Sequence, residues 1–419
     1  GRQKTRAGRD QSVGRPWLWI GFLVAGLLSA CAGTPGREQP LGMVVSSAFS
    51  PDSKLLGVST SEGEIALFDT QPLWFRRQLS RDADKRPAPK GYSEMLAAVY
   101  RPQPLVFSPD GTRLAAVGVA ENIVMWDIAS GAEQFRVPAN GTILDLAFFA
   151  DGQKLLTAGP EVLIRSTSDG KQLGQLPLAA GTTATAAAVS SEGLLLIGLS
   201  TGEIALYDGT SLQLLRTWKA HQAPVTGLAF GPDGKSFAST AGGYDLRLWK
   251  KDGEGTFDQG TPPVTPADAA ESMAKAQGAG AFLWLLGTIR GFQMVGAPTL
   301  GAPPMVAGVD SQFAKAARNL PHHCGSRVAF SANGRYLAST ANLMLCPDCI
   351  GTLSPAFMLF VTDLATGKTI TARDTGCAVA ISPDGRIVAT GTAGKPLLWD
   401  STTGQALKDV PPPAAPAQR

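Results

Sequence analysis

One turn recurs at a constant step along the chain and constrains the fold more than any other feature. It is most complete at Pro232-Asp233-Gly234. Proline fixes φ at the start of such a turn, aspartate bonds back to the backbone and glycine accepts a positive φ. The acidic residue of the turn returns every 41 residues, at Asp110, Asp151, Glu192 and Asp233. Because short apolar runs surround each turn, every repeat is predicted to form a small unit of consecutive strands.

The turn occurs seven times, at Pro51-Asp52, Pro109-Asp110-Gly111, Asp151-Gly152, Glu192-Gly193, Pro232-Asp233-Gly234, Asn333-Gly334 and Pro383-Asp384-Gly385. An aromatic-aspartate pair or its remnant follows most copies, at Phe68-Asp69, Trp126-Asp127, Tyr207-Asp208, Trp249-Lys250, Thr362-Asp363 and Trp399-Asp400. These features resemble the WD-repeat family, whose unit of about 40 to 45 residues forms one four-stranded propeller blade. The resemblance implies an all-β, seven-bladed WD-repeat-type β-propeller over residues 43–410, and it specifies architecture rather than activity.

The ring is expected to close within its last blade. Residues 405–410 are predicted to form the outermost strand of blade seven, because the segment Ala32–Gly42 is short and rich in Pro and Gly. This differs from the usual arrangement in WD-repeat rings, in which the N-terminal segment supplies that strand. Residues 411–419 are then expected to form a flexible tail.

The first thirty residues have the pattern of a signal peptide. A basic lead precedes an uncharged apolar run, Trp17–Ala30, that is too short to span a bilayer comfortably. The sequence Leu28-Ser29-Ala30-Cys31 resembles the bacterial lipobox, which implies lipidation of Cys31 and a tether over residues 31–42. Ala32 does not match the aspartate signal for inner-membrane retention, so the periplasmic side of the outer membrane is expected. The cell surface, or ordinary secretion with an incidental cysteine, is the alternative.

The charge balance argues against nucleic acid as a partner. The chain has 37 basic and 34 acidic residues, and residues 1–30 contain five of the basic residues and one of the acidic residues. The remaining body is therefore nearly neutral and lacks the basic surface that nucleic-acid binding needs.

Three insertions interrupt the repeats, at about residues 81–101, 260–321 and 341–355. By analogy with WD-type blades all three emerge on one face, called the top face below, and such loops commonly bind partners. The insertion at 260–321, between blades five and six, is predicted to be partly helical, with helices over 267–277 and 311–319. Its most apolar residues are the predicted partner-binding residues, with a lid on the ring or a membrane contact as alternatives: Phe282, Trp284, Leu285 and Leu286.

Four further cysteines are expected to lie near one another on the top face. In an oxidising compartment two disulfides are favoured, with Cys324 to Cys377 and Cys346 to Cys349 as the first choice among three pairings. A zinc site built from the same four thiolates, or one that recruits a histidine, is the alternative, although only one C-x-x-C pair is present.

No catalytic set of side chains stands out in the sequence. His221 resembles the structural histidine of the family, which hydrogen-bonds a residue of the second strand, here Ser239 or Thr240. The spacing of Asp245 departs from the family pattern and leaves its role open. We therefore expect a protein that is not an enzyme and has no cofactor: a lipid-anchored scaffold or assembly subunit that binds an envelope protein or protein complex. A propeller with a metal or small-ligand site at the cysteine cluster is the alternative.

Overall fold

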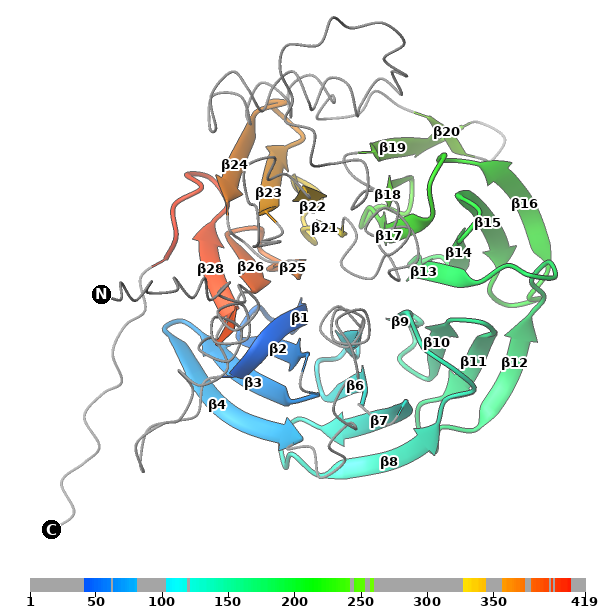
Figure 1. Ribbon diagram of the computed structural model, residues 1–419, viewed down its shortest axis with the longest axis horizontal. Coiled ribbons are helices and arrows are strands. Elements are labelled where there is room, and N and C mark those ends of the chain that lie inside the picture. Colours follow the sequence, from blue (N-terminus) through cyan, green and yellow to red (C-terminus); the bar gives the residue numbers. More distant parts are fainter. Residues whose placement is uncertain are drawn as a thin grey trace, which may run out of the picture. The chain divides into compact units, whose positions relative to one another are not determined.

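Seven small antiparallel sheets are arranged as blades around a common axis (Figure 1). This computed structural model describes residues 41–61, 63–80, 103–118, 121–241, 245–252, 257–259, 327–343, 356–373, 378–391, 393–394 and 396–407. Every element within these residues is a strand, so the all-β, seven-bladed prediction is confirmed. The predicted helices at 267–277 and 311–319 lie outside the described residues. Among the described residues there is also no helix with the length and apolar character needed to span a bilayer.

The strands of each blade follow one another in the sequence. Blade one contains β1 (Leu41–Phe49), β2 (Leu55–Thr60), β3 (Ile65–Thr70) and β4 (Leu73–Ser80). Blade two contains β5 (Leu105–Phe107), β6 (Arg113–Val117), β7 (Asn122–Asp127) and β8 (Glu133–Pro138). Blade three contains β9 (Asp145–Phe148), β10 (Lys154–Ala158), β11 (Val162–Ser166) and β12 (Gln172–Leu176). Blade four contains β13 (Ala184–Val189), β14 (Leu194–Leu199), β15 (Glu203–Asp208) and β16 (Leu214–Lys219).

The second half of the ring repeats this order. Blade five contains β17 (Val225–Phe230), β18 (Ser236–Ala241), β19 (Asp245–Lys251) and β20 (Phe257–Gln259). Blade six contains β21 (Val328–Phe330), β22 (Tyr336–Leu343), β23 (Ala356–Asp363) and β24 (Thr369–Arg373). Blade seven contains β25 (Val379–Ile381), β26 (Ile387–Gly391) and β28 (Pro396–Asp400), and the short β27 (Ala393–Gly394), between β26 and β28, pairs with β1 of blade one. The first strand of each blade lies nearest the axis, and the last strand forms the outer edge (Figure 1).

The recurring turn joins the first and second strands of a blade, as its residues predict. Gly234 has a φ of 64°, and its N–H donates to the Gly231 carbonyl at 3.0 Å. The Asp233 carboxylate accepts the Lys235 N–H at 3.0 Å. Only glycine takes this left-handed conformation without a steric cost, which explains its place in the motif.

The core is divided among the interfaces between neighbouring blades. In the cluster that joins blades four and five, the Phe237 ring stacks on Trp249 with 5.5 Å between centroids and meets Phe257 edge to face at 4.9 Å. All three rings are buried, and full burial of one large apolar side chain contributes about 1.5 to 3 kcal/mol. Blade three lacks the aromatic-aspartate pair but forms a complete blade, with the side chain of Arg165 buried at the position expected for the aromatic ring.

Polar links between adjacent blades supplement this packing. The guanidinium of Arg113 in blade two donates to the Thr167 hydroxyl at 2.9 Å and to the Gly152 carbonyl at 2.8 Å, both in blade three. The hydroxyl of Thr185 in blade four donates to the Val225 carbonyl of blade five at 2.6 Å. These bonds hold neighbouring blades in register.

The ring closes through contacts at both ends of the described chain. Blade seven is a three-stranded sheet whose fourth position is held by a single bridge between Trp399 and Ala406, rather than by the predicted strand over 405–410. Residues 408–410 lie outside the described residues. The strand β1 begins at Leu41, and Leu41 and Met43 pair with β27, which lies between β26 and β28. The N-terminal residues thus reach blade seven, but not at its outer edge.

Candidate functional site

The site residues predicted from the sequence lie outside the described residues. This holds for the lipidation residue, for all four residues of the cysteine cluster and for the apolar partner-binding residues: Cys31, Cys324, Cys346, Cys349, Cys377, Phe282, Trp284, Leu285 and Leu286. Neither the disulfides nor the alternative zinc site is therefore tested. Within the described ranges, no group of three or more His, Cys, Asp or Glu side chains is placed to hold a metal ion.

The strand ends that flank the three insertions lie on one face of the ring. The first connects β4 to β5 and the second connects β20 to β21, so both join the outer strand of one blade to the inner strand of the next. The third connects β22 to β23, the second and third strands of blade six. Because strands alternate in direction within a blade, these three connections all leave from the face at which inner strands begin. This is the top face.

An ion pair between two non-adjacent blades lies at the top end of the axis. Asp145 is the first residue of β9 in blade three, and Arg327 immediately precedes β21 in blade six. The Arg327 Nη1 and Asp145 Oδ1 atoms are 3.8 Å apart, which is too long for a hydrogen bond. Both side chains are largely buried, with 22% of Arg327 and 16% of Asp145 exposed. We call these two residues the axial ion pair.

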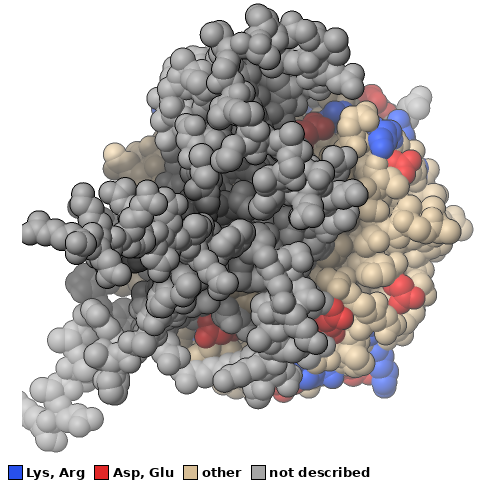
Figure 2. Space-filling model, in the orientation of Figure 1, with Lys and Arg blue, Asp and Glu red and all other residues tan. Residues whose placement is uncertain are grey.

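The carboxylate of Asp145 also accepts two backbone hydrogen bonds. Oδ1 accepts the Leu146 N–H at 3.0 Å, and Oδ2 accepts the N–H of Ala187 in blade four at 2.9 Å. Burial raises the pKa of Asp145, because the charged form loses its hydration, and this outweighs the opposing effects of Arg327 and the two N–H groups. In contrast, acidic and basic side chains of the described residues mix along the solvent-exposed edge shown in Figure 2.

A second polar cluster, in blade five, has a structural role. Its His221 Nδ1 lies 2.7 Å from Asp245 Oδ2, and its Nε2 lies 2.7 Å from the Ser239 hydroxyl, which also accepts the Trp249 Nε1–H at 2.8 Å. The predicted bond from His221 to Ser239 is confirmed, and Asp245, whose role the sequence left open, completes the chain of bonds. Burial disfavours the charged form of Asp245, but the hydrogen bonds from His221 and Arg247 outweigh it and lower its pKa. Because every member is paired within the blade, this cluster offers no free group for chemistry.

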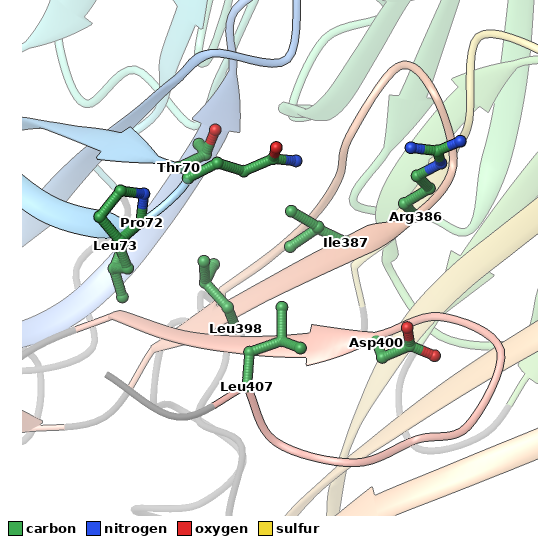
Figure 3. Close-up of a pocket in the computed structure, with 9 residues that line it drawn as sticks. Thr70, Pro72, Leu73, Arg386, Ile387, Leu398, Asp400 and Leu407 are labelled. Atoms are coloured by element: carbon green, nitrogen blue, oxygen red, sulfur yellow. The ribbon is translucent and has the colours of Figure 1, made fainter. Parts of the chain in front are cut away.

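A cavity of about 310 Å³ lies at the seam between blades one and seven (Figure 3). Its walls come from the β3–β4 turn of blade one and from the lower ends of β26 and β28. The charged groups in it are Arg386 and Asp400, and the carboxylate of Asp400 is already bonded to Thr402 and Thr403. The cavity therefore reflects the incomplete outer edge of blade seven rather than a reactive site. Its lining residues are Thr70, Gln71, Pro72, Leu73, Arg386, Ile387, Leu398, Asp400 and Leu407.

The sequence did not single out the axial ion pair. Each residue stands alone beside a short apolar strand, and charged residues in such positions are common at strand ends. The pairing depends on the ring bringing blades three and six to opposite sides of one axis. A charged residue at the start of an innermost strand is the one local signal that could have marked either residue.

Comparisons with known proteins agree with this architecture. Residues 212–250 match the family model described as "WD domain, G-beta repeat". The chain is 31% identical over 144 residues to an uncharacterized WD repeat-containing protein of Synechocystis, and 28% identical over 151 residues to Protein ROOT INITIATION DEFECTIVE 3 of Arabidopsis thaliana. Each match covers 33% of this chain, and they cover 40% and 33% of the two relatives, so less than half of either relative is spanned.

A solved structure resembles nearly the whole ring. The crystal structure of the Swd1 β-propeller domain of Myceliophteria thermophila superimposes with a TM-score of 0.58 at 13% identity, covering 87% of this chain and 98% of that chain. At this level of identity the match speaks to the fold alone. Together with the seven observed blades, it shows that the chain folds as a seven-bladed β-propeller, within which residues 212–250 match a single WD repeat.

Proposed function

We propose that the chain is a lipid-anchored scaffold of the bacterial envelope that binds a partner protein through its top face. The observation that carries this proposal is the position of the insertions. The strand ends at Ser80, Gln259 and Leu343 all open on the top face. On the opposite face, the turns between first and second strands stay as short as the repeat motif requires.

The nature of the fold supports a binding role rather than catalysis. WD-repeat propellers generally act as scaffolds for protein interactions, because their rim loops vary without disturbing the stacked strands. The polar clusters of the described residues serve packing, as in blade five, or lie at the axis of the top face. A partner that covers this face would contact several blades at once.

The anchor is proposed from the sequence. Cys31 ends the motif that resembles a lipobox, and ten residues, Cys31 to Pro40, precede the first strand. Fully extended, these residues reach about 35 Å, so a lipid on Cys31 would keep the propeller close to the membrane surface. Cys31→Ser should move the protein from the membrane fraction to the soluble fraction in the native host. Unchanged membrane association would contradict the anchor without bearing on the partner face.

Deletion of residues 260–321 tests the partner face. In cells treated with a crosslinker, the full-length protein should recover a specific envelope protein, and the deletion variant, with a Gly-Ser linker in place of the insertion, should not. Gln153→Ala and Lys235→Ala change exposed residues on the opposite face and serve as matched controls that keep full recovery. Circular dichroism of each purified variant verifies that the ring is intact. Equal recovery by the deletion variant and the full-length protein would refute the proposal.

A further inference from the structure

Among the described residues, the two members of the axial ion pair do not use all of their hydrogen-bonding capacity. The guanidinium of Arg327 has five N–H donors, and none of them makes a hydrogen bond with a described residue. The carboxylate of Asp145 accepts one backbone N–H on each oxygen and retains acceptor capacity on both. A largely buried carboxylate that keeps unused acceptors bears a desolvation cost without the full compensation of an ion pair.

The ion pair of Arg247 and Asp245 in blade five, which has a structural role, gives a geometry with which the axial pair can be compared. There Arg247 Nε donates to Asp245 Oδ1 at 2.8 Å and Nη2 donates to Oδ2 at 3.2 Å, a two-point contact. The axial pair, at 3.8 Å, is neither hydrogen-bonded nor bidentate. Charge-assisted hydrogen bonds between guanidinium and carboxylate normally lie near 2.7 to 2.9 Å, so the axial guanidinium is held weakly.

The position of the pair also separates it from the links that hold the ring together. Arg113 with Thr167, and Thr185 with Val225, join adjacent blades that share a packed interface. Asp145 and Arg327 belong to blades three and six, which share no interface, and meet at the axis of the top face. Ring closure therefore does not require this pair.

We propose that Asp145 is the receptor for an arginine side chain that a partner protein presents at the top end of the axis, and that Arg327 occupies this position until the partner binds. Arg327 demonstrates that a guanidinium entering beside an inner strand comes close to the carboxylate. A partner's arginine aligned with both oxygens would form the two-point contact that Arg327 lacks. Arg327, already 22% exposed, would then move into solvent. This inference rests on the proposed top-face binding role and names the chemistry of one contact within it.

Small probes test the receptor without knowledge of the partner. N-acetyl-arginine-N-methylamide is titrated into the purified full chain and followed by ligand-observed NMR and calorimetry, beside the citrulline analogue, which is isosteric and uncharged. The wild type should bind the arginine probe weakly. Arg327→Ala removes a weakly held competitor whose effective concentration is on the order of millimolar, so it should tighten binding about twofold or more. Asp145→Asn should abolish the response in both backgrounds.

Several results would overturn the proposal. They are equal responses to the arginine and citrulline probes, no gain in Arg327→Ala, or binding that survives Asp145→Asn. A lysine analogue that binds as well as the arginine probe would refute the two-point contact. If circular dichroism shows that Asp145→Asn does not fold, the proposal is still tested by comparing the binding of the arginine and citrulline probes to Arg327→Ala. The probe assay contains no partner protein, so a negative result there does not contradict the proposed scaffold function. Conversely, a negative crosslinking result does not contradict a positive result with the arginine probe.

Discussion

Removal of the Ser239 hydroxyl from blade five should lower the free energy of unfolding by more than the loss of a single hydrogen bond. Ser239 is fully buried, and its Oγ accepts the Trp249 Nε1–H at 2.8 Å and lies 2.7 Å from His221 Nε2. Ser239→Ala leaves an indole donor and an imidazole nitrogen without partners in a site that excludes water. The backbone and the packing volume change little, so the expected cost comes from these two orphaned groups.

The magnitude follows from the cost of an unpaired buried polar group, about 1 to 3 kcal/mol each. Trp249 is 4% exposed and His221 is 1% exposed, so neither group regains full hydration. We expect Ser239→Ala to lower the free energy of unfolding by roughly 2 to 6 kcal/mol, because two such groups are affected.

Blade seven supplies a matched control. There the Trp399 Nε1–H donates to the Thr390 hydroxyl at 2.8 Å, and the described residues of this blade contain no histidine. Thr390→Val therefore leaves one group unpaired, the indole N–H of the partly buried Trp399, and should cost less than half as much. Urea unfolding followed by tryptophan fluorescence measures both variants, and hydrogen exchange locates the loss in β18 and β19 for Ser239→Ala. Equal losses in the two variants, or a loss below about 1 kcal/mol for Ser239→Ala, would refute this accounting of buried polar groups.

Three further predictions concern blade contacts, pH and the cysteines. Arg113→Ala should lower the free energy of unfolding by about 1 to 3 kcal/mol, because it leaves the Gly152 carbonyl and Thr167 without their guanidinium partner, and equal urea midpoints would contradict this. Burial raises the pKa of Asp145, so protonation of this carboxyl should favour the folded state. As the pH is lowered from 7 to 4.5, the stability of the wild type relative to Asp145→Asn, measured by urea unfolding, should therefore rise. A difference that stays constant or falls would show that the carboxyl is not desolvated. Native and reduced intact masses, measured with a zinc analysis, should reveal two disulfides without bound metal, whereas stoichiometric zinc would support the alternative site at the four cysteines.

Local turn chemistry made the ring predictable. The proline, aspartate and glycine at 232–234 need only their immediate neighbours to form the turn, and the constant step between turns then fixes the blades. The bond from His221 to Ser239 was equally predictable, because both residues belong to the most complete repeat.

Features that depend on distant parts of the chain could not be predicted in this way. Asp245 joins the blade-five cluster because β19 begins at this residue and pairs it with Ala241, a register that counting back from the tryptophan did not reveal. The contact of β1 with β27 arises only when the ring closes and brings blades seven and one together, and the axial ion pair only when the inner strands of blades three and six face each other across the axis. The predicted cysteine and apolar sites stay predictions, because they lie outside the described residues.

Site-specific photocrosslinking in the native host tests the central claim most directly. A photoreactive amino acid is placed at exposed top-face positions, Asn140 between β8 and β9 and Thr201 between β14 and β15, and at exposed turns of the opposite face, Gln153 and Lys235. If the top face binds the partner, irradiation yields one specific adduct from Asn140 and Thr201 and none from Gln153 and Lys235. Adducts from the opposite face alone, or from neither face, would contradict the account.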